Sequence, residues 1–238
     1  MNYKKTLVAS AAFYPKGQLP AGVYAMLETA SLHGVDVTLI GLDEPHVSNY
    51  ESKLVKLLAA VRPLQDYEFV VIADAVDLLW ATGLGELHYQ FARYGAPFIM
   101  SGEANCWPHG QYTDRMPNAP HRFRFLNSGF YMATWPEFLD VTEKLLASPA
   151  FLHPKYARDD QGVWQDAWMR GSIRLRVEYE CRLCQSLHGV NGHWSMLNPD
   201  IAWGKRPKNL VTNSYPCVFH GNGDGKRFMD GLRDMLLL

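Results

Sequence analysis

The sequence predicts a single α/β domain with a mainly parallel central sheet flanked by helices, and three observations favour this fold class. Short apolar segments alternate with longer segments whose apolar residues recur at helical spacing. One apolar segment, residues 69–73, is entirely nonpolar, as expected for a strand that helices cover on both faces. The 238 residues, 47% of them hydrophobic, can bury one large core and contain no repeat or linker. We therefore expect residues 1–238 to form one domain.

The alternation sets the order of elements in the first half of the chain. Strands are expected at 6–11, 36–42, 69–73 and 97–101, and helices at 20–33, 50–61 and 84–94. Leu54, Leu57 and Leu58 illustrate the spacing, because residues three and four apart share one face of a helix. A strand, a helix and a further strand in this order predict βαβ units, which place the strands parallel.

The second half is less regular. Residues 102–122 hold many Pro, Gly, Asn and His residues and are expected to form a long surface loop, a kind of segment that often carries function. A strand is expected at 130–133, and helices at 136–147 and 159–169. The rest of the chain is expected to mix short strands with loops.

The bulk composition excludes several classes of protein. A formal net charge of -1 with 20% charged residues does not fit a disordered chain or a strongly basic nucleic-acid-binding protein. The apolar run after the first two lysines is too short for a membrane span and lacks a signal-peptide core, so we expect a cytoplasmic protein. Four cysteines in a chain of this length do not indicate a secreted disulfide framework.

Two carboxylates follow the third expected strand. Asp74 and Asp77 lie at its carboxyl end, where open α/β sheets bind their ligands. In a continuing strand their side chains would point to opposite faces, so both can face one metal ion only if the chain turns after Asp74. The alternative is that one carboxylate caps the next helix and the other is solvated, and the spacing alone favours that alternative.

A histidine and a glycine turn follow a second short apolar run. His220 precedes Gly221, Asn222 and Gly223, with Lys226 three residues further on. With two carboxylates, the imidazole completes an oxygen and nitrogen ligand set for a divalent ion such as Mn²⁺. Glycine lets backbone N–H groups approach phosphate, so metal with diphosphate indicates an enzyme that uses a nucleotide-linked donor. The alternative is a strand-ending turn beside a buried histidine.

Three further sets of polar residues are candidates for contact with substrate. Asp159 and Asp160 offer carboxylates for an acceptor hydroxyl or a cationic sugar, although either can instead cap the helix that follows. Asn127 lies in a run of small polar residues before an expected strand, where it can bind sugar hydroxyls or belong to an ordinary turn. Trp107 can stack on a sugar face, and a packing role explains it equally well.

A zinc site is not expected. Cys181 and Cys184 form a C-x-x-C pair with His188 and His193 nearby, but structural zinc usually needs a second ligand pair at a suitable spacing. The other two cysteines match such a spacing poorly.

Five short motifs occur in order along the chain. They are D-x-x-D from Asp74, S-x-E-x-x-C-W-P from Ser101, R-F-L-N-S-G from Arg124, D-D-Q from Asp159 and H-G-N-G-x-x-K from His220. Together they resemble the glycosyltransferase domain of the procollagen lysyl hydroxylases and, more distantly, the procollagen galactosyltransferases. The resemblance extends from about Phe69 to Lys226, and five ordered motifs are far more specific than any one of them.

The resemblance implies a GT-A fold with a Rossmann-like nucleotide-sugar-binding sheet, a UDP-sugar donor and Mn²⁺. It assigns the metal to Asp74, Asp77 and His220. It assigns the nucleotide and its diphosphate to Lys53, Gly221, Asn222, Gly223 and Lys226. It assigns Asp159 and Asp160 to the sugar, and Trp107 to the border of the active site.

The sequence departs from the family at two places. Where the family has an aromatic residue that packs on uracil, this chain has Val76, so base stacking must come from elsewhere or the nucleotide differs. The family's acidic run is shortened to Asp159 and Asp160 after Arg158. We expect neither a hydroxylase domain nor a secretion signal, and a small free-standing enzyme of this kind would suit a bacterium or a phage.

We therefore expect a metal-dependent glycosyltransferase that moves a hexose, glucose or galactose, from a UDP-sugar to a hydroxyl acceptor. The acceptor class stays open among proteins, glycans, lipids and modified DNA bases, and no membrane partner is expected. One alternative is a nucleotide-sugar-binding module without catalysis, which Val76 favours slightly. Another is a metal-dependent phosphohydrolase or nuclease, which leaves the later motifs unexplained.

Overall fold

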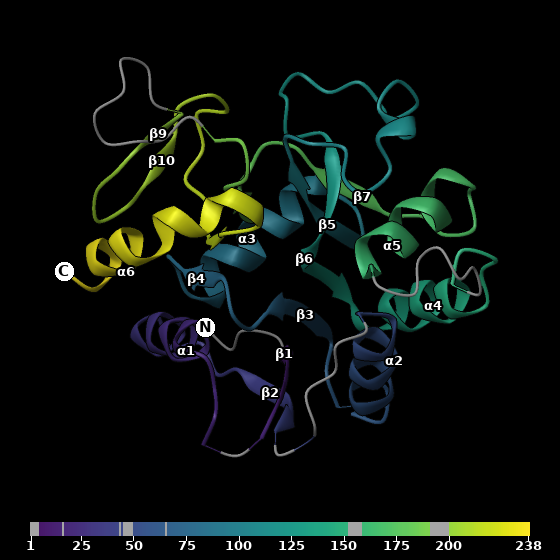
Figure 1. Cartoon of the computed structure of the whole chain (residues 1–238), viewed down its shortest axis with the longest axis horizontal. Helices are drawn as coiled ribbons and strands as arrows, with labels where there is room; N and C mark the ends of the chain where they lie inside the picture. Colours follow the sequence, from purple (N-terminus) through teal and green to yellow (C-terminus); the bar gives the residue numbers. More distant parts are fainter. Residues whose placement is uncertain are drawn as a thin grey trace.

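The main sheet of this computed structural model has the mainly parallel arrangement that the sequence predicts (Figure 1). The structure describes residues 5–15, 17–42, 44, 50–64, 66–151, 159–190 and 200–238, with only the backbone for 50–53. Within these residues the sheet contains, in spatial order, β2 (Thr38–Leu42), β1 (Thr6–Tyr14), β3 (Phe69–Asp74), β6 (Phe125–Thr134), β5 (Phe98–Glu103) and β7 (Arg176–Glu178). Strand β6 runs antiparallel to both of its neighbours, and the other paired strands are parallel.

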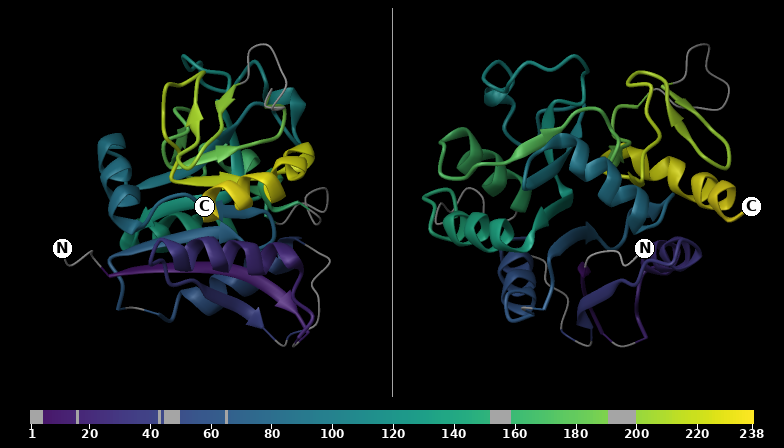
Figure 2. Two further views of the ribbon diagram at one scale, coloured as in Figure 1. Left: turned by 90° about the vertical axis from the view of Figure 1, so that its left-hand side faces the viewer. Right: turned by 180° about the vertical axis from the view of Figure 1, so that it is seen from behind.

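Helices pack on both faces of this sheet (Figures 1 and 2). One face contacts α1 (Ala21–Leu32) and α3 (Leu84–Tyr94), and the other contacts α2 (Tyr50–Val61), α4 (Trp135–Leu146) and α5 (Asp160–Met169). Strand β3 contributes to the core on each face of the sheet. Val70 and Ile72 pack on the face covered by α2, α4 and α5, and Phe69 and Val71 pack on the face covered by α1 and α3. This double burial explains why the strand carries no polar side chain before Asp74.

A smaller sheet brings the two halves of the site together. It contains β4 (Leu78–Trp80), β11 (Val218–His220) and β8 (Cys184–Ser186), with β11 antiparallel to β4 and parallel to β8. The chain bends between Asp74 and Leu78, as a shared metal site requires. His220 pairs with Leu78, so the end of β11 lies beside the bend that carries Asp77.

The remaining elements lie in the loops and at the end of the chain. They are the 3-10 helices η1 (Gly110–Tyr112) and η3 (Gly223–Phe228), the strands β9 (Ile201–Ala202) and β10 (Lys208–Asn209), and helix α6 (Met229–Leu237). The β9–β10 pair and the loop after β5 rise on the same side of the molecule in Figure 1. None of the described helices is long and apolar enough to cross a membrane.

Three expectations from the sequence were wrong. The strand expected at 130–133 begins at Phe125, so Asn127 lies inside β6 and not in a turn before it. The loop at 102–122 is not wholly on the surface, because Tyr112 and Met116 pack with Phe125 in a small core of their own. Helix α6 was not expected, because the end of the chain was expected to mix short strands with loops.

Candidate active site

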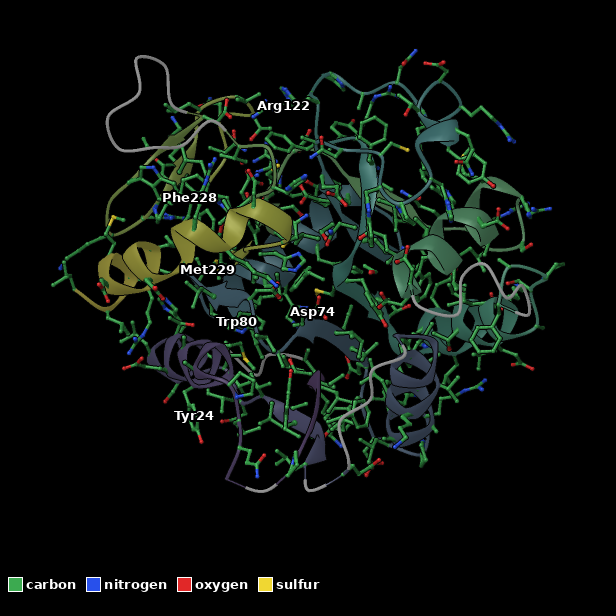
Figure 3. All side chains as sticks on the ribbon, in the orientation of Figure 1. Tyr24, Asp74, Trp80, Arg122, Phe228 and Met229 are labelled. Atoms are coloured by element: carbon green, nitrogen blue, oxygen red, sulfur yellow. The ribbon has the colours of Figure 1, made fainter. Side chains whose placement is uncertain are left out.

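A pocket of about 310 Å³ lies where the carboxyl end of β3, the middle of β6 and the start of α5 meet. Asp74 marks its place near the centre of the molecule (Figure 3). The residues that line it are Asp74, Asp77, Glu103, Trp107, Asn127, Ser128, Gly129, Asp159, Asp160, Gln161, His188, His220, Asn222 and Gly223. Residues from all five sequence motifs therefore face one cavity.

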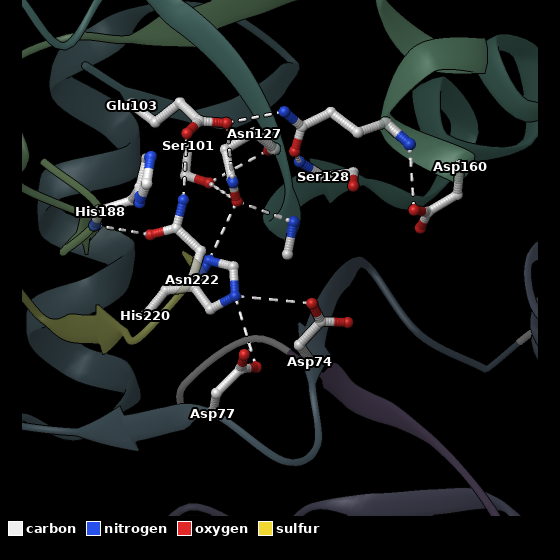
Figure 4. A network of polar contacts seen from close by, with 12 residues as sticks. Asp74, Asp77, Ser101, Glu103, Asn127, Ser128, Asp160, His188, His220 and Asn222 are labelled. Carbon is white, nitrogen blue, oxygen red and sulfur yellow. Dashed lines mark hydrogen bonds and ion pairs between the residues drawn. The ribbon is translucent and has the colours of Figure 1, made fainter. Parts of the chain in front are cut away.

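The two carboxylates and the histidine converge as the metal hypothesis requires (Figure 4). His220 Nε2 lies 3.5 Å from Asp74 Oδ2 and 3.5 Å from Asp77 Oδ1. One ligand atom from each of the three residues can be chosen so that all lie within 4.8 Å of one another. Two carboxylate oxygens and an imidazole nitrogen at these distances suit a hard or borderline divalent ion such as Mn²⁺.

Asn127 fixes which nitrogen of His220 faces the carboxylates. The Asn127 Oδ1 atom accepts a hydrogen bond from the backbone N–H of Gly129 at 2.9 Å, which identifies it as the oxygen. His220 Nδ1 lies 3.0 Å from that oxygen and must therefore carry a proton. Nε2 then faces Asp74 and Asp77, and once a metal ion replaces any proton on it, this is the arrangement of a metal-binding histidine held by an outer partner.

An irregularity in β6 makes room for the imidazole. Between Met100 and Ser101 of β5, the pairing partner in β6 jumps from Tyr131 to Asn127. The backbone near Gly129 thus approaches the His220 ring so closely that a Cβ on this residue would lie 2.1 Å from Cε1. Position 129 must therefore be glycine to leave space for the His220 ring. Asn127 and Gly129 of this motif thus position the histidine.

The charges around the pair of carboxylates favour a bound cation. Burial lowers the pKa of His220, but the carboxylates of Asp77 and Asp74 outweigh burial and raise that pKa to about 10. Burial raises the pKa of Asp77, but His220 outweighs it and the net pKa is lowered. Lys226 Nζ also lies 3.5 Å from Asp77 Oδ2. The site therefore attracts positive charge, whether it comes from protons, from lysine or from a metal ion.

Glu103, for which the sequence predicted no role in the site, is the centre of a buried network. Its carboxylate accepts hydrogen bonds from three side-chain amides: Gln161 at 2.6 Å, Asn222 at 3.1 Å and Asn127 at 3.2 Å (Figure 4). Glu103 is 2% exposed, and burial raises its pKa although the amide hydrogen bonds oppose the shift. It joins the metal side of the pocket to α5. Its place in the S-x-E-x-x-C-W-P motif was a signal that could have identified it.

The two aspartates of the D-D-Q motif lie at the start of α5. Asp159 is the N-cap residue, and its side chain accepts a hydrogen bond from the Gly162 backbone N–H. Burial, with a contribution from nearby Asp160, raises the pKa of Asp159 to about 6. Asp160 Oδ1 accepts from the Gln161 backbone N–H at 3.0 Å. Capping and a role in the pocket are therefore compatible in one motif.

The glycine turn after β11 divides its tasks. The Gly221 N–H donates to the Asp77 carbonyl at 2.7 Å, which locks the turn to the acid-bearing bend and leaves this N–H unavailable for a phosphate. Asn222 and Gly223 line the pocket, and Lys226 follows on η3. The part of the turn open to a diphosphate is thus its second half.

Among the other residues that the sequence singled out, some line the pocket and others lie elsewhere or outside the described residues. Trp107 lines the pocket with 57% of its surface exposed, and its carbonyl accepts from Gln161 at 2.7 Å. Val76 is 36% exposed. Lys53 falls in α2, but its side chain lies outside the described residues. Cys181 and Cys184 are buried free thiols, and burial raises the pKa of both.

A solved glycosyltransferase shares this fold. The chain superposes on a glycosyltransferase involved in the glycosylation of the major capsid of PBCV-1 with a TM-score of 0.52. The match covers 97% of this chain and 99% of that one at 13% sequence identity, so it shows the fold alone. The expected GT-A-like α/β class is therefore confirmed.

Sequence relatives point to one family. The chain is 25% identical over 180 residues to the uncharacterized protein R699 of Acanthamoeba polyphaga mimivirus, covering 75% of this chain and 36% of that protein. It is 26% identical over 219 residues to procollagen-lysine,2-oxoglutarate 5-dioxygenase of Drosophila melanogaster, covering 86% and 29%. With human multifunctional procollagen lysine hydroxylase and glycosyltransferase LH3, identity is 25% over 163 residues, covering 66% and 21%.

These relatives are much longer proteins, and the chain spans about a third of their length or less. The match to a family model is more extensive on this chain. The model described as the PLOD GT domain, the glycosyltransferase domain of the procollagen lysyl hydroxylases, matches residues 18–236. That span includes every residue of the pocket. The chain therefore belongs to the PLOD glycosyltransferase-domain family.

Proposed function

We propose that this protein is a metal-dependent glycosyltransferase that moves a hexose from a UDP-sugar to a hydroxyl acceptor. The observation that carries the proposal is the convergence of Asp74, Asp77 and His220 in a pocket, with Asn127 holding the imidazole for metal ligation. A metal ion held by such a set of ligands can stabilise the charge on a nucleotide diphosphate leaving group. Membership of a glycosyltransferase family supports the same reaction class.

The metal side of the pocket would manage the leaving group. A divalent ion such as Mn²⁺, held by Asp74, Asp77 and His220, would neutralise charge on the diphosphate. When the bond between the anomeric carbon and the diphosphate oxygen breaks, its electron pair stays on that oxygen. Lys226 and the second half of the glycine turn, Asn222 and Gly223, would bind the phosphate oxygens, while Gly221 holds the turn in place.

The α5 side of the pocket would manage the sugar and the acceptor. Asp159, with a pKa of about 6, is a carboxylate at neutral pH that still binds a proton readily. We assign it, with Asp160, to the acceptor hydroxyl or to the positive charge that develops on the sugar. Trp107 would border the sugar with its exposed ring. Asn127 and Glu103 would position these groups.

This function can be tested by measuring nucleotide release from a panel of nucleotide-sugars by the purified protein, with Mn²⁺ and with a chelator. We expect Mn²⁺-dependent release of UDP from one donor, and a faster release when a hydroxyl acceptor is present. An acceptor panel of peptides, glycans, lipids and hydroxymethylated DNA then identifies the acceptor class. Metal-independent release, or no release and no UDP binding, would overturn it.

One observation favours a second candidate, a nucleotide-sugar-binding module without catalysis. Val76 is a partly exposed aliphatic residue where the family resemblance implies an aromatic ring for the base, which weakens the case for an intact donor site. Donor binding in calorimetry, together with neither transfer nor hydrolysis of any donor, would support this second candidate.

A further inference from the structure

His188 lines the pocket, but the proposed metal and sugar contacts give it no role. It follows β8 in the chain and faces the same cavity as the metal-binding triad. Its side chain is 38% exposed, and Figure 4 shows it close to Asn222 and Glu103. In the sequence, His188 follows shortly after the C-x-x-C pair, and no contact with a donor was predicted for it.

Asp224 holds the imidazole of His188 from behind. The Asp224 backbone N–H donates to His188 Nδ1 at 3.1 Å, so in a neutral ring Nδ1 is the acceptor and Nε2 carries the proton. His188 Nδ1 also lies 2.6 Å from Asp224 Oδ1, an ion pair when the ring is charged and both nitrogens carry protons. In either state Nε2 carries a hydrogen. No described residue hydrogen-bonds Nε2, which is thus available to a ligand.

Two backbone hydrogen bonds and one close contact fix the His188 ring against the glycine turn. The backbone N–H of His188 donates to Asn222 Oδ1 at 3.0 Å, and that of Gly189 donates to Asp224 Oδ1 at 3.0 Å. Gly223 has a φ of +54°, and a Cβ on it would lie 2.4 Å from His188 Nδ1. The His188 imidazole therefore packs directly against the turn that would bind phosphate. Only glycine at position 223 permits this close approach.

We propose that His188, supported by Asp224, is a diphosphate-binding residue whose Nε2–H donates a hydrogen bond to the phosphate oxygens of the donor. The inference rests on the proposed function, because it names a further contact to the same leaving group. The ring packs on Gly223, lines the metal pocket and carries an Nε2 atom without a partner among the described residues. A hydrogen bond to a charged oxygen strengthens as the diphosphate gains charge.

The test measures binding of inorganic pyrophosphate at saturating Mn²⁺ by calorimetry, which requires neither a base nor a sugar. We expect His188→Ala to weaken binding by roughly 10-fold to 100-fold, the usual effect of losing a hydrogen bond to a charged group. His188→Gln keeps an N–H near the Nε2 position and should recover most of the loss. Asp224→Asn should weaken binding less than His188→Ala does. His121→Ala, a histidine replacement outside the pocket, is the matched control and should bind as the unaltered protein does.

The outcomes separate this inference from the proposed function. Equal pyrophosphate affinity in His188→Ala and the unaltered protein overturns the inference alone, since sugar transfer could proceed without this contact. A His188-dependent affinity with no turnover of any nucleotide-sugar upholds the inference and contradicts the transferase. Absence of pyrophosphate binding in the unaltered protein with Mn²⁺ overturns the inference and counts against the transferase as well.

Discussion

His220 Nδ1 lies 3.0 Å from Asn127 Oδ1, and this one contact connects β11, which carries the proposed metal ligand His220, with the irregular part of β6. The Gly129 N–H holds the Asn127 oxygen in place, so the histidine Nε2 is directed at the two carboxylates. A proton and a metal ion compete for that nitrogen. Metal binding should therefore release a proton from the imidazole, whose pKa the carboxylates raise to about 10.

Asn127→Ala should weaken Mn²⁺ binding by roughly 10-fold to 100-fold, the range found for outer-shell partners of metal ligands. The imidazole would lose the acceptor that sets its tautomer, while all three ligands stay in the chain. Titration calorimetry with Mn²⁺ measures the effect. Asn118→Ala, in the loop away from the metal ligands, is the control, and equal affinity in both variants would contradict the account.

Glu103→Gln should reduce donor turnover at least about tenfold, because one amide cannot accept from three amides as a carboxylate does. The NH₂ group of the new glutamine would face another NH₂ group in a buried place and push Gln161 or Asn222 out of position. Steady-state rates of UDP release measure this. Glu137→Gln, on α4 and outside the pocket, should leave the rate unchanged. Undiminished turnover in Glu103→Gln would show that the network is dispensable.

Asp159 should impose a pH dependence on turnover. Burial raises its pKa to about 6, so the fraction of carboxylate increases between about pH 5 and pH 7. At saturating Mn²⁺ the rate of UDP release should increase over that range and level off above it. Asp159→Asn should lower the rate and remove this inflection, whereas Asp160→Asn should keep the inflection. An unchanged pH profile in Asp159→Asn would exclude its assigned role.

Glu178 should make the free energy of unfolding decrease as the pH increases. It is fully buried against Tyr94, and burial raises its pKa from 4.5 to about 7. Below about pH 4.5 both folded and unfolded chains hold the proton, and between the two values the folded chain holds it more. The free energy of unfolding should thus decrease by about 3 kcal/mol between pH 4.5 and pH 7 on account of this residue.

Glu178→Gln should remove that decrease, because the amide does not titrate. Urea unfolding at a series of pH values measures it, with Glu180→Gln as a partly exposed control two residues away. If Glu178→Gln retained the slope of the unaltered protein, the carboxylate would not be the group responsible.

Asp74, Asp77 and His220 each lie at or just after the end of an apolar strand, which is why the sequence indicates them as candidate metal ligands. The structure brings the three side chains together, and the bend after Asp74 lets both acids face the histidine. Helices α2 and α3 begin and end at the expected residues, since their apolar spacing is regular. The strand ends and the two helices depend on residues close in the chain, whereas the meeting of His220 with the two acids depends on the pairing of β11 with β4.

The parts that were missed depend on contacts between distant segments. Glu103 is hydrogen-bonded to residues up to 119 positions away, and no local pattern encodes that. Asn127 resembled a turn residue, but pairing of β6 with β3 and β5 draws its segment into the sheet. His188 gains a partner in Asp224 only through the pairing of β8 with β11.

The most direct test compares UDP release and Mn²⁺ affinity in Asp77→Ala, His220→Ala and the unaltered protein. Circular dichroism confirms that each variant is folded. Loss of a metal ligand should remove several kcal/mol of stabilisation of the departing diphosphate, so both variants should lose Mn²⁺ binding and at least about 100-fold in turnover. If both variants release UDP at the rate of the unaltered protein, the three residues do not hold a catalytic metal and the central claim is wrong.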